Sequence, residues 1–197
     1  MMPGMVTGKD LMAWNSEVRW PWGERVPATT NKPVPVIEST TSQGWRDAAT
    51  PDRQPSSGSA QWAVIEGLGP RGRALALEPA SLASSWGEND ARAPVAEFDF
   101  TCKGGDAEVS VSFLPTFRIY PGLKQRVAVC VDDHASSIVE VPGSSGAENE
   151  NGPIRSAAVQ NNHVIAKISM PGLSAGKHTL KIRAVDPGVV VNAILLP

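Results

Sequence analysis

The chain has 197 residues, of which 41% are hydrophobic and 19% charged, with a formal net charge of -2. This length suits one β-sandwich or two small domains, and it can bury a core without disulfides or metals. The near-neutral charge gives no reason to expect a nucleic-acid partner. No apolar run approaches the roughly 18 residues of a membrane span, and the first residues lack the apolar core of a signal peptide, so none is predicted.

The first 32 residues differ from the rest of the chain. Trp14, Trp20 and Trp22 lie among prolines and glycines, without a sustained helical or strand period. The segment 1–32 is therefore interpreted as an irregular Trp-rich linker, or as a remnant of a preceding helical region. The range 33–197 is predicted to form the folded domain.

From residue 33 onward the pattern is that of short strands separated by turns. The predicted strands are 34–39, 62–65, 73–79, 94–102, 107–115, 126–133, 137–141, 163–170, 177–185 and 189–197. The connections rich in Gly, Pro, Ser and Asp are predicted loops or turns at 42–60, 67–72, 80–93, 142–153 and 186–188. No crossover helix for a parallel sheet is predicted. The fold class is therefore all-β, an antiparallel β-sandwich or jelly roll.

Alternation is clear in the range 177–185, near the end of the chain. One predicted face carries the apolar residues Leu180, Ile182 and Ala184. The other carries the polar residues Thr179, Lys181 and Arg183. Side chains alternate across a strand, so the first set is expected in the core and the second in solvent.

The two cysteines, Cys102 and Cys130, are too few for a disulfide framework or a zinc site. They are predicted to be buried core thiols, with a single disulfide between them as the alternative. No metal and no cofactor are predicted. The three histidines lack metal-ligand spacing and a nearby nucleophile motif; they are His134, His163 and His178. A structural calcium ion is the alternative, held by loop carboxylates such as Asp90, Glu148 or Glu150.

Four blocks of sequence together resemble a known family. They are WAVIEGLGPRGRALALEP (62–79), APVAEFDF (93–100), LPTFRIYPGLKQRVAVCVDD (114–133) and GKHTLKIRAVDPGVVVNAILL (176–196). In this order they resemble the C-terminal domain of glycoside hydrolase family 115, the xylan α-glucuronidases. The last block is the most specific of the four, and VPVIES (34–39) resembles a weaker version of the strand that opens that domain.

The resemblance implies a β-sandwich at the end of a multidomain enzyme that degrades hemicellulose. The family's catalytic groups lie in an upstream (β/α) barrel, so no catalytic residue is expected in this chain. The expected partner is the catalytic part of the parent enzyme or another subunit. The parent enzyme is expected to be periplasmic or extracellular in bacteria. The alternative function is a carbohydrate-binding module for glucuronoxylan.

Two pairs of carboxylates are candidates for glycoside hydrolysis, which needs two suitably spaced carboxyl groups. Asp132 and Asp133 are adjacent at a strand end, so their side chains point to opposite faces and are interpreted as turn residues. Glu97 and Asp99 share one face of a predicted strand, roughly 7 Å apart. They are interpreted as the solvated face of an edge or outer strand.

Aromatic rings in loops are the candidates for sugar binding, because they stack on the apolar faces of pyranose rings. The candidate residues are Trp45, Trp86 and Tyr120. Local packing is the alternative for Trp45 and Trp86. Trp62 opens a predicted strand and is expected in the core.

Overall fold

The computed structural model describes residues 39–41, 43–55, 58–80, 86–87, 90–118, 124–144 and 152–197. These residues all belong to one compact unit, Val34–Pro197. The predicted segment 1–32 and the predicted strand at 34–39, apart from its last residue, lie outside the described residues. The boundary between residues 32 and 33 therefore stays a prediction.

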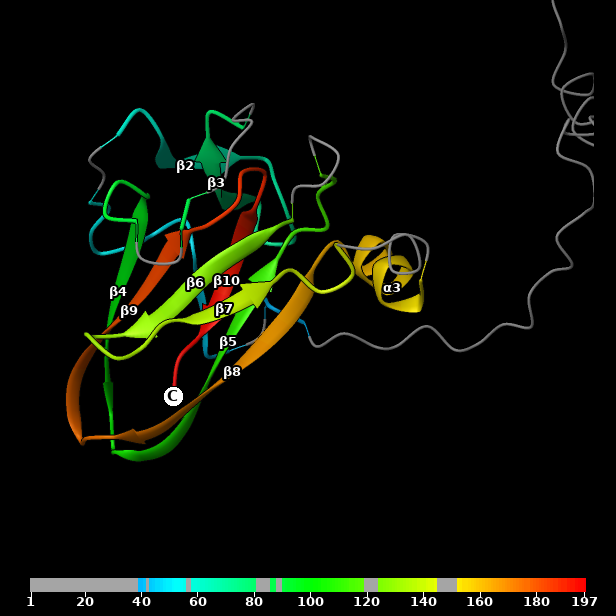
Figure 1. The fold of residues 1–197 in the computed structure, drawn as a ribbon. Helices are drawn as coiled ribbons and strands as arrows, with labels where there is room; N and C mark the ends of the chain where they lie inside the picture. Colours follow the sequence, from blue (N-terminus) through cyan, green and yellow to red (C-terminus); the bar gives the residue numbers. More distant parts are fainter. Residues whose placement is uncertain are drawn as a thin grey trace, which may run out of the picture. The chain divides into compact units, whose positions relative to one another are not determined.

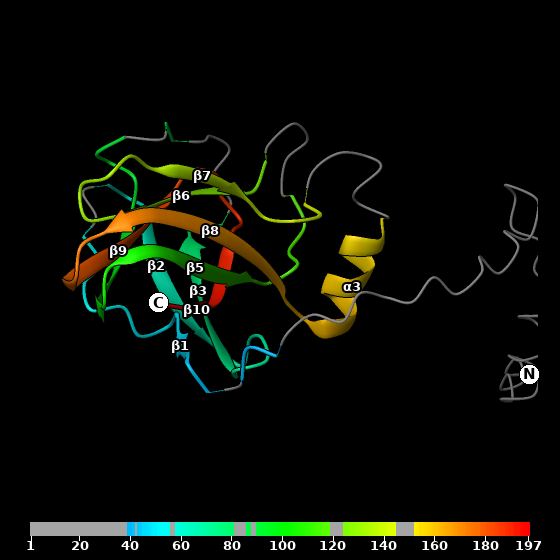
Figure 2. The same ribbon diagram turned by 90° about the horizontal axis from the view of Figure 1, so that it is seen from below.

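Two antiparallel sheets face each other as a sandwich, which confirms the predicted fold class (Figure 1). The six-stranded sheet has the order β2 (Gln61–Glu66), β3 (Arg73–Glu78), β10 (Val190–Leu195), β5 (Gly105–Phe113) and β8 (Val164–Leu173), with β1 (Trp45–Asp47) also paired to β10. The four-stranded sheet has the order β4 (Val95–Cys102), β9 (Gly176–Ala184), β6 (Arg126–Val131) and β7 (Ser137–Glu140). In the view from below, β6 and β7 lie in one layer and β5 and β10 in the other (Figure 2).

The core fills the space between the two sheets and follows the predicted alternation. Leu180 and Ile182 are fully buried and Ala184 nearly so, as expected for the inward face of β9. The outward residues of this strand keep part of their surface exposed; they are Thr179, Lys181 and Arg183. Val109, Val111 and Phe113 of β5 supply the facing layer and are also fully buried.

Two connections carry the chain from one sheet to the other at the same end of the sandwich. The β4–β5 connection and the β8–β9 connection run side by side, because β4 pairs with β9 and β5 pairs with β8 (Figure 1). Gly104, with φ +85°, sits where they meet, and a Cβ there would lie 2.8 Å from the backbone nitrogen of Ala175. A glycine is needed here for both its backbone conformation and this close approach.

Two elements of the structure are not predicted from the sequence. Strand β1 lies in the range 42–60, which was predicted to be a loop, and helix α3 spans Pro153–Asn161. The helix has no side-chain N-cap bond, no acidic residue in its first turn and no basic residue in its last turn, all of which would help to mark its limits in the sequence. It is held by tertiary burial of Arg155, Ala157 and Ala158. Among the described residues, no helix has the length and apolar character needed to cross a membrane.

Candidate functional site

A surface hollow of about 480 Å³ opens beside β4 and β9. Strand β6 ends at Val131, which pairs with Leu180, so the start of β9 has β4 on one side and, among the described residues, no strand on the other. The turn that follows β6 fills part of this gap. The hollow is lined by Arg53, Asp99, Phe100, Thr101, Asp132, Lys177, His178 and Thr179.

Arg53 reaches the hollow because residues 52–55 run along the outer edge of β4. The backbone N–H of Asp52 donates to the carbonyl of Glu97 (2.8 Å), and that of Glu97 donates to the carbonyl of Arg53 (2.9 Å). The Arg53 guanidinium then donates from Nε to Glu97 (2.6 Å) and through two nitrogens to Asp99 (2.7 Å each). This short stretch covers an edge that would otherwise expose unpaired backbone groups.

Asp99 is held firmly in its ionised form. Besides Arg53, the hydroxyl of Thr179 donates to it (2.8 Å). The hydrogen bonds from Arg53 first, and from Thr179 second, lower the pKa of Asp99 to about 2. Glu97 and Asp99 do lie on an edge strand, and both side chains are bound to Arg53.

On the other side of the hollow, His178 is bound through both ring nitrogens. Nδ1 lies 2.7 Å from a carboxylate oxygen of Asp132, and Nε2 lies 2.9 Å from the carbonyl oxygen of Ser174. Two oxygen acceptors require two N–H donors, which only the imidazolium supplies. The hydrogen bond to Asp132 first, and that to Ser174 second, accordingly raise the pKa of His178.

Asp132 occupies the turn after β6 and ties it to β9. Its backbone N–H donates to the carbonyl of Thr179 (2.8 Å), and its carboxylate accepts from the N–H of Thr179 (2.9 Å). Burial raises the pKa of Asp132. The hydrogen bonds from His178 and Thr179 together lower this pKa by more, so the net shift is downward. Its φ of +52° is a left-handed conformation that Asp tolerates better than most residues. Asp132 is thus a turn residue, as interpreted, whose side chain also has a partner on β9.

These bonds determine what the hollow can do chemically. A general acid for glycoside hydrolysis is a carboxyl group with a raised pKa, whereas the pKa values of Asp99 and Asp132 are both lowered. A histidine general base needs a free ring nitrogen, whereas both nitrogens of His178 face oxygen acceptors. The arrangement suits fixed charges better than proton transfer.

The His178 contacts predict a loss of stability as the pH rises. A folded pKa above the ordinary 6.5 means that the contribution of His178 is complete below that value and is lost as the pH passes the folded pKa. Urea unfolding on both sides of pH 6.5 should show this decline in the wild type. The decline should be smaller in His178→Gln and unchanged in His134→Gln, a substitution at an exposed position. Equal declines in both variants would contradict the assignment.

The structure describes two of the three aromatic candidates, Trp45 and Trp86, and neither of them lines the hollow. Trp45 opens β1 and is only 6% exposed, so its ring offers no free face to a sugar, and its position is that of the packing alternative. Trp86 is half-buried against the core cluster. Tyr120 lies outside the described residues. Trp62 is 3% exposed and donates from Nε1 to the carbonyl of Pro94 (3.2 Å), as expected for a core residue.

Both cysteines are free thiols, so the disulfide alternative is not present in this structure. Cys130 is buried as predicted, whereas Cys102 is only partly buried, with its thiol 3.3 Å from the carbonyl oxygen of Ser174. The described residues contain no group of three His, Cys, Asp or Glu side chains placed to hold a metal ion. The calcium candidates Glu148 and Glu150 lie outside the described residues, and Asp90 is paired with Arg92 (2.8 Å).

Sequence reasoning missed Arg53, Lys177 and the contact between His178 and Asp132. Arg53 lies in the predicted loop at 42–60, which has no strand or helix period. The local sequence therefore could not predict its carboxylate partners. For His178 a signal exists, because it shares the inward parity of Leu180 and Ile182. A histidine on an inward face near a strand end needs a polar partner, and the turn after β6, with Asp132 and Asp133, is a source of one.

Comparisons with known proteins agree with the resemblance. A family model described as the glycosyl hydrolase family 115 C-terminal domain matches residues 46–197. No curated protein matches the chain. A solved family 115 4-O-methyl-α-glucuronidase with specificity for decorated arabinogalactans is similar over 75% of this chain and 18% of its own, at 22% identity and a TM-score of 0.51. That likeness concerns the fold alone, and the chain spans only 18% of that enzyme's length.

Two other solved structures are similar to this chain at lower TM-scores. An exo-β-1,3-galactanase from Phanerochaete chrysosporium is 14% identical, with a TM-score of 0.48, over 78% of this chain and 29% of its own. A family 35 carbohydrate binding module from Clostridium thermocellum is 13% identical, with a TM-score of 0.48, over 79% of this chain and 98% of its own. The family model, in contrast, covers most of the sequence, from β1 to the last residue. The chain therefore belongs to the family of glycosyl hydrolase family 115 C-terminal domains.

Proposed function

We propose that this chain is a non-catalytic accessory domain of a family 115 glycoside hydrolase, packing on the catalytic part of the parent enzyme or on another subunit. The observation that carries the proposal is the state of the two carboxylates in the hollow. Asp99 is bound by Arg53 and Asp132 by His178, and both pKa values are lowered. Neither group is prepared to protonate the leaving oxygen of a glycosidic bond.

The proposal is tested by an assay for uronic acid release by the purified chain. The assay uses two polysaccharides. Glucuronoxylan is chosen because of the sequence resemblance, and a decorated arabinogalactan because the solved family 115 enzyme is specific for such polysaccharides. No release is expected from either, under conditions in which a complete family 115 enzyme releases uronic acid. Release by this chain that Asp99→Asn or Asp132→Asn abolishes would overturn the proposal.

Packing on a partner has a separate test in the complete protein that carries this domain. Backbone amides of the sandwich that face the partner should exchange hydrogen more slowly there than in the isolated chain, because burial removes them from water. Identical exchange throughout residues 39–197 would argue against packing.

Carbohydrate binding is the second candidate function, and one observation favours it. The hollow is lined by the half-buried Phe100 and by two exposed polar residues, Thr101 and Lys177. Such a mixture of one apolar surface and a few polar groups is typical of sugar sites. Trp86 and Tyr120 stay proposals as further sugar contacts, whereas Trp45 is too buried to be one.

A further inference from the structure

We infer that His178 is a pH-sensitive latch that fastens the β8–β9 connection, residues 174 and 175, to the turn after β6. The ring of His178 lies between two acceptors that belong to different parts of the fold. Nδ1 lies 2.7 Å from a carboxylate oxygen of Asp132 in the turn, and Nε2 lies 2.9 Å from the carbonyl oxygen of Ser174 in the connection. A movement of this kind within the domain is independent of the proposed non-catalytic role.

The two contacts exist together only while the ring is an imidazolium. A neutral imidazole has one N–H donor and one nitrogen with a lone pair, so one of the two acceptors then faces a lone pair at hydrogen-bond distance. The remaining proton stays on Nδ1, because a carboxylate is a stronger acceptor than a carbonyl. Asp132 is also held in place by Thr179, through its own backbone N–H and its carboxylate. Ser174 is therefore the partner that is released.

The protonated ring is the state that the fold favours. The hydrogen bond to Asp132 first, and that to the Ser174 carbonyl second, raise the pKa of His178 above the ordinary 6.5. The latch is therefore closed below that value and opens as the pH rises through the folded pKa.

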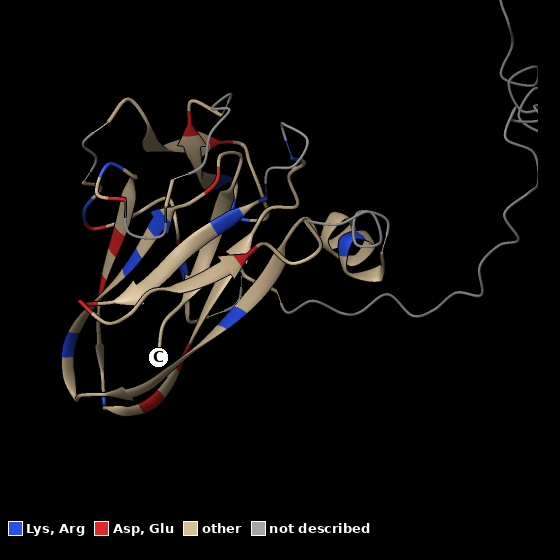
Figure 3. Cartoon of the chain, in the orientation of Figure 1, with Lys and Arg blue, Asp and Glu red and all other residues tan. Residues whose placement is uncertain are grey.

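Asp132 is the charge that decides the protonation of His178. The other titratable groups at this end of the sandwich are Arg53, Asp99, Cys102, Asp106, His134 and Lys177. Arg53 and Asp99 form an ion pair (2.7 Å), and Lys177 lies on the opposite face of β9 from His178. Figure 3 shows acidic residues on both sides of this end, at the turn after β6 and near the start of β5.

The contacts that hold the connection from β4 and β5 are weaker than the contact with an imidazolium. Cys102 Sγ lies 3.3 Å from the carbonyl oxygen of Ser174, and a thiol is a weak donor. The backbone N–H of Gly172 donates to the Asp106 carboxylate (3.1 Å) at an exposed position. Ser174 itself is exposed, so its released carbonyl can bond to water instead.

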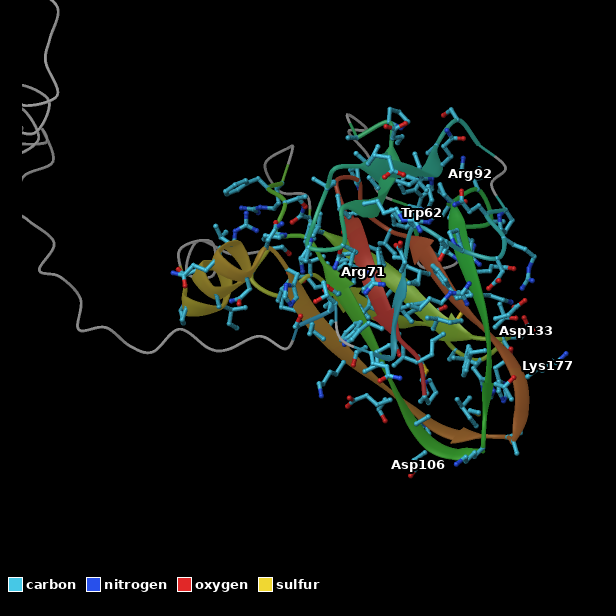
Figure 4. The ribbon with its side chains drawn as sticks, turned by 180° about the vertical axis from the view of Figure 1, so that it is seen from behind. Trp62, Arg71, Arg92, Asp106, Asp133 and Lys177 are labelled. Atoms are coloured by element: carbon cyan, nitrogen blue, oxygen red, sulfur yellow. The ribbon has the colours of Figure 1, made fainter. Side chains whose placement is uncertain are left out.

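The movement is confined to one end of the sandwich. Strand pairing resumes on both sides of the connection, at Leu173 of β8 and at Gly176 of β9. Figure 4 shows this end, with Asp106 near the start of β5 and Lys177 near the start of β9. Opening therefore frees residues 174 and 175 without separating the strands of either sheet.

The test is an NMR titration of the full chain between about pH 5 and about pH 9, the range in which a histidine of this kind changes its charge. Above the midpoint, the nitrogen chemical shifts of the His178 ring should show a proton on Nδ1 and none on Nε2. The amide signals of residues 172–176 should shift with the same midpoint. The Gly172 amide should exchange its hydrogen about tenfold faster than base catalysis alone predicts, through loss of a charge-assisted hydrogen bond nearby.

Three variants separate the latch from other effects of pH. His178→Gln should abolish the transition at residues 172–176. His134→Gln replaces an exposed histidine in the same turn as Asp132 and should leave the transition unaltered. Asp132→Asn keeps the shape of the side chain and removes its charge, so it should move the midpoint to lower pH.

Several results would overturn the latch. They are a His178 ring that does not titrate in this range, a remaining proton on Nε2, and unchanged signals of residues 172–176 while His178 titrates. Persistence of the transition in His178→Gln, or an unchanged midpoint in a folded Asp132→Asn variant, would contradict it as well. None of these results bears on the non-catalytic role, which is decided by uronic acid release.

Discussion

Phe98→Ala is expected to lower the free energy of unfolding by about 4 kcal/mol, because it removes a buried aromatic side chain and leaves a cavity. Phe98 has no exposed surface and belongs to the core cluster between the sheets. Its register partner on β9, Leu180, is also fully buried. The Arg46 guanidinium lies 5.2 Å from the ring centroid and loses this contact as well. Urea unfolding followed by tryptophan fluorescence measures the change.

Phe117→Ala is the matched control, because it removes the same atoms from a ring that is 75% exposed. Its one described ring contact is the Arg155 guanidinium, 4.2 Å from the centroid. The expected loss is therefore below about 1 kcal/mol. A similar loss in the two variants would mean that the core does not lie between β4 and the facing sheet.

The core was predictable from the sequence, whereas the hollow was not, and the reason is the range of the contacts involved. The inward face of β9 follows from alternation within nine residues, Gly176–Ala184. The contact of Arg53 with Asp99 spans 46 positions, and so does that of His178 with Asp132. Each depends on strand pairing that local patterns do not specify. The sequence therefore identified Glu97 and Asp99 as neighbours but could not supply the arginine between them.

Trp45 is a second case in which a contact between residues far apart in the sequence could not be predicted from local patterns. Trp45 was a sugar-binding candidate because Gly, Pro and Ser surround it. In the structure Trp45 starts the three-residue strand β1, which pairs with β10 near the end of the chain. The register partner of Trp45 there is Leu195. Three residues are too few for alternation to be recognised. Composition alone could not place this ring inside the fold.

A loss of about 3 kcal/mol in the free energy of unfolding is expected for Asp186→Ala, since the substitution breaks a partly buried ion pair and both of its hydrogen bonds. The Asp186 side chain has no exposed surface and accepts from Arg126 Nε (2.6 Å) and from a second guanidinium nitrogen (3.1 Å). Its backbone N–H also donates to the carbonyl of Arg126 (3.1 Å), so the pair joins the end of β9 to the start of β6. Water reaches the Arg126 side chain, which is 30% exposed, and this places the loss at the lower end for buried pairs.

Asp133→Ala is the control that separates the loss of the Asp186–Arg126 ion pair from the general effect of removing a carboxylate. The Asp133 side chain is fully exposed, and its bond to Lys181 is a surface pair, so the expected loss is below about 1 kcal/mol. Asp186→Asn keeps the shape of the side chain and should fall between the two alanine variants. Thermal unfolding of the three variants beside the wild type measures the order. If Asp133→Ala cost as much as Asp186→Ala, burial would not be what makes the Asp186 pair important.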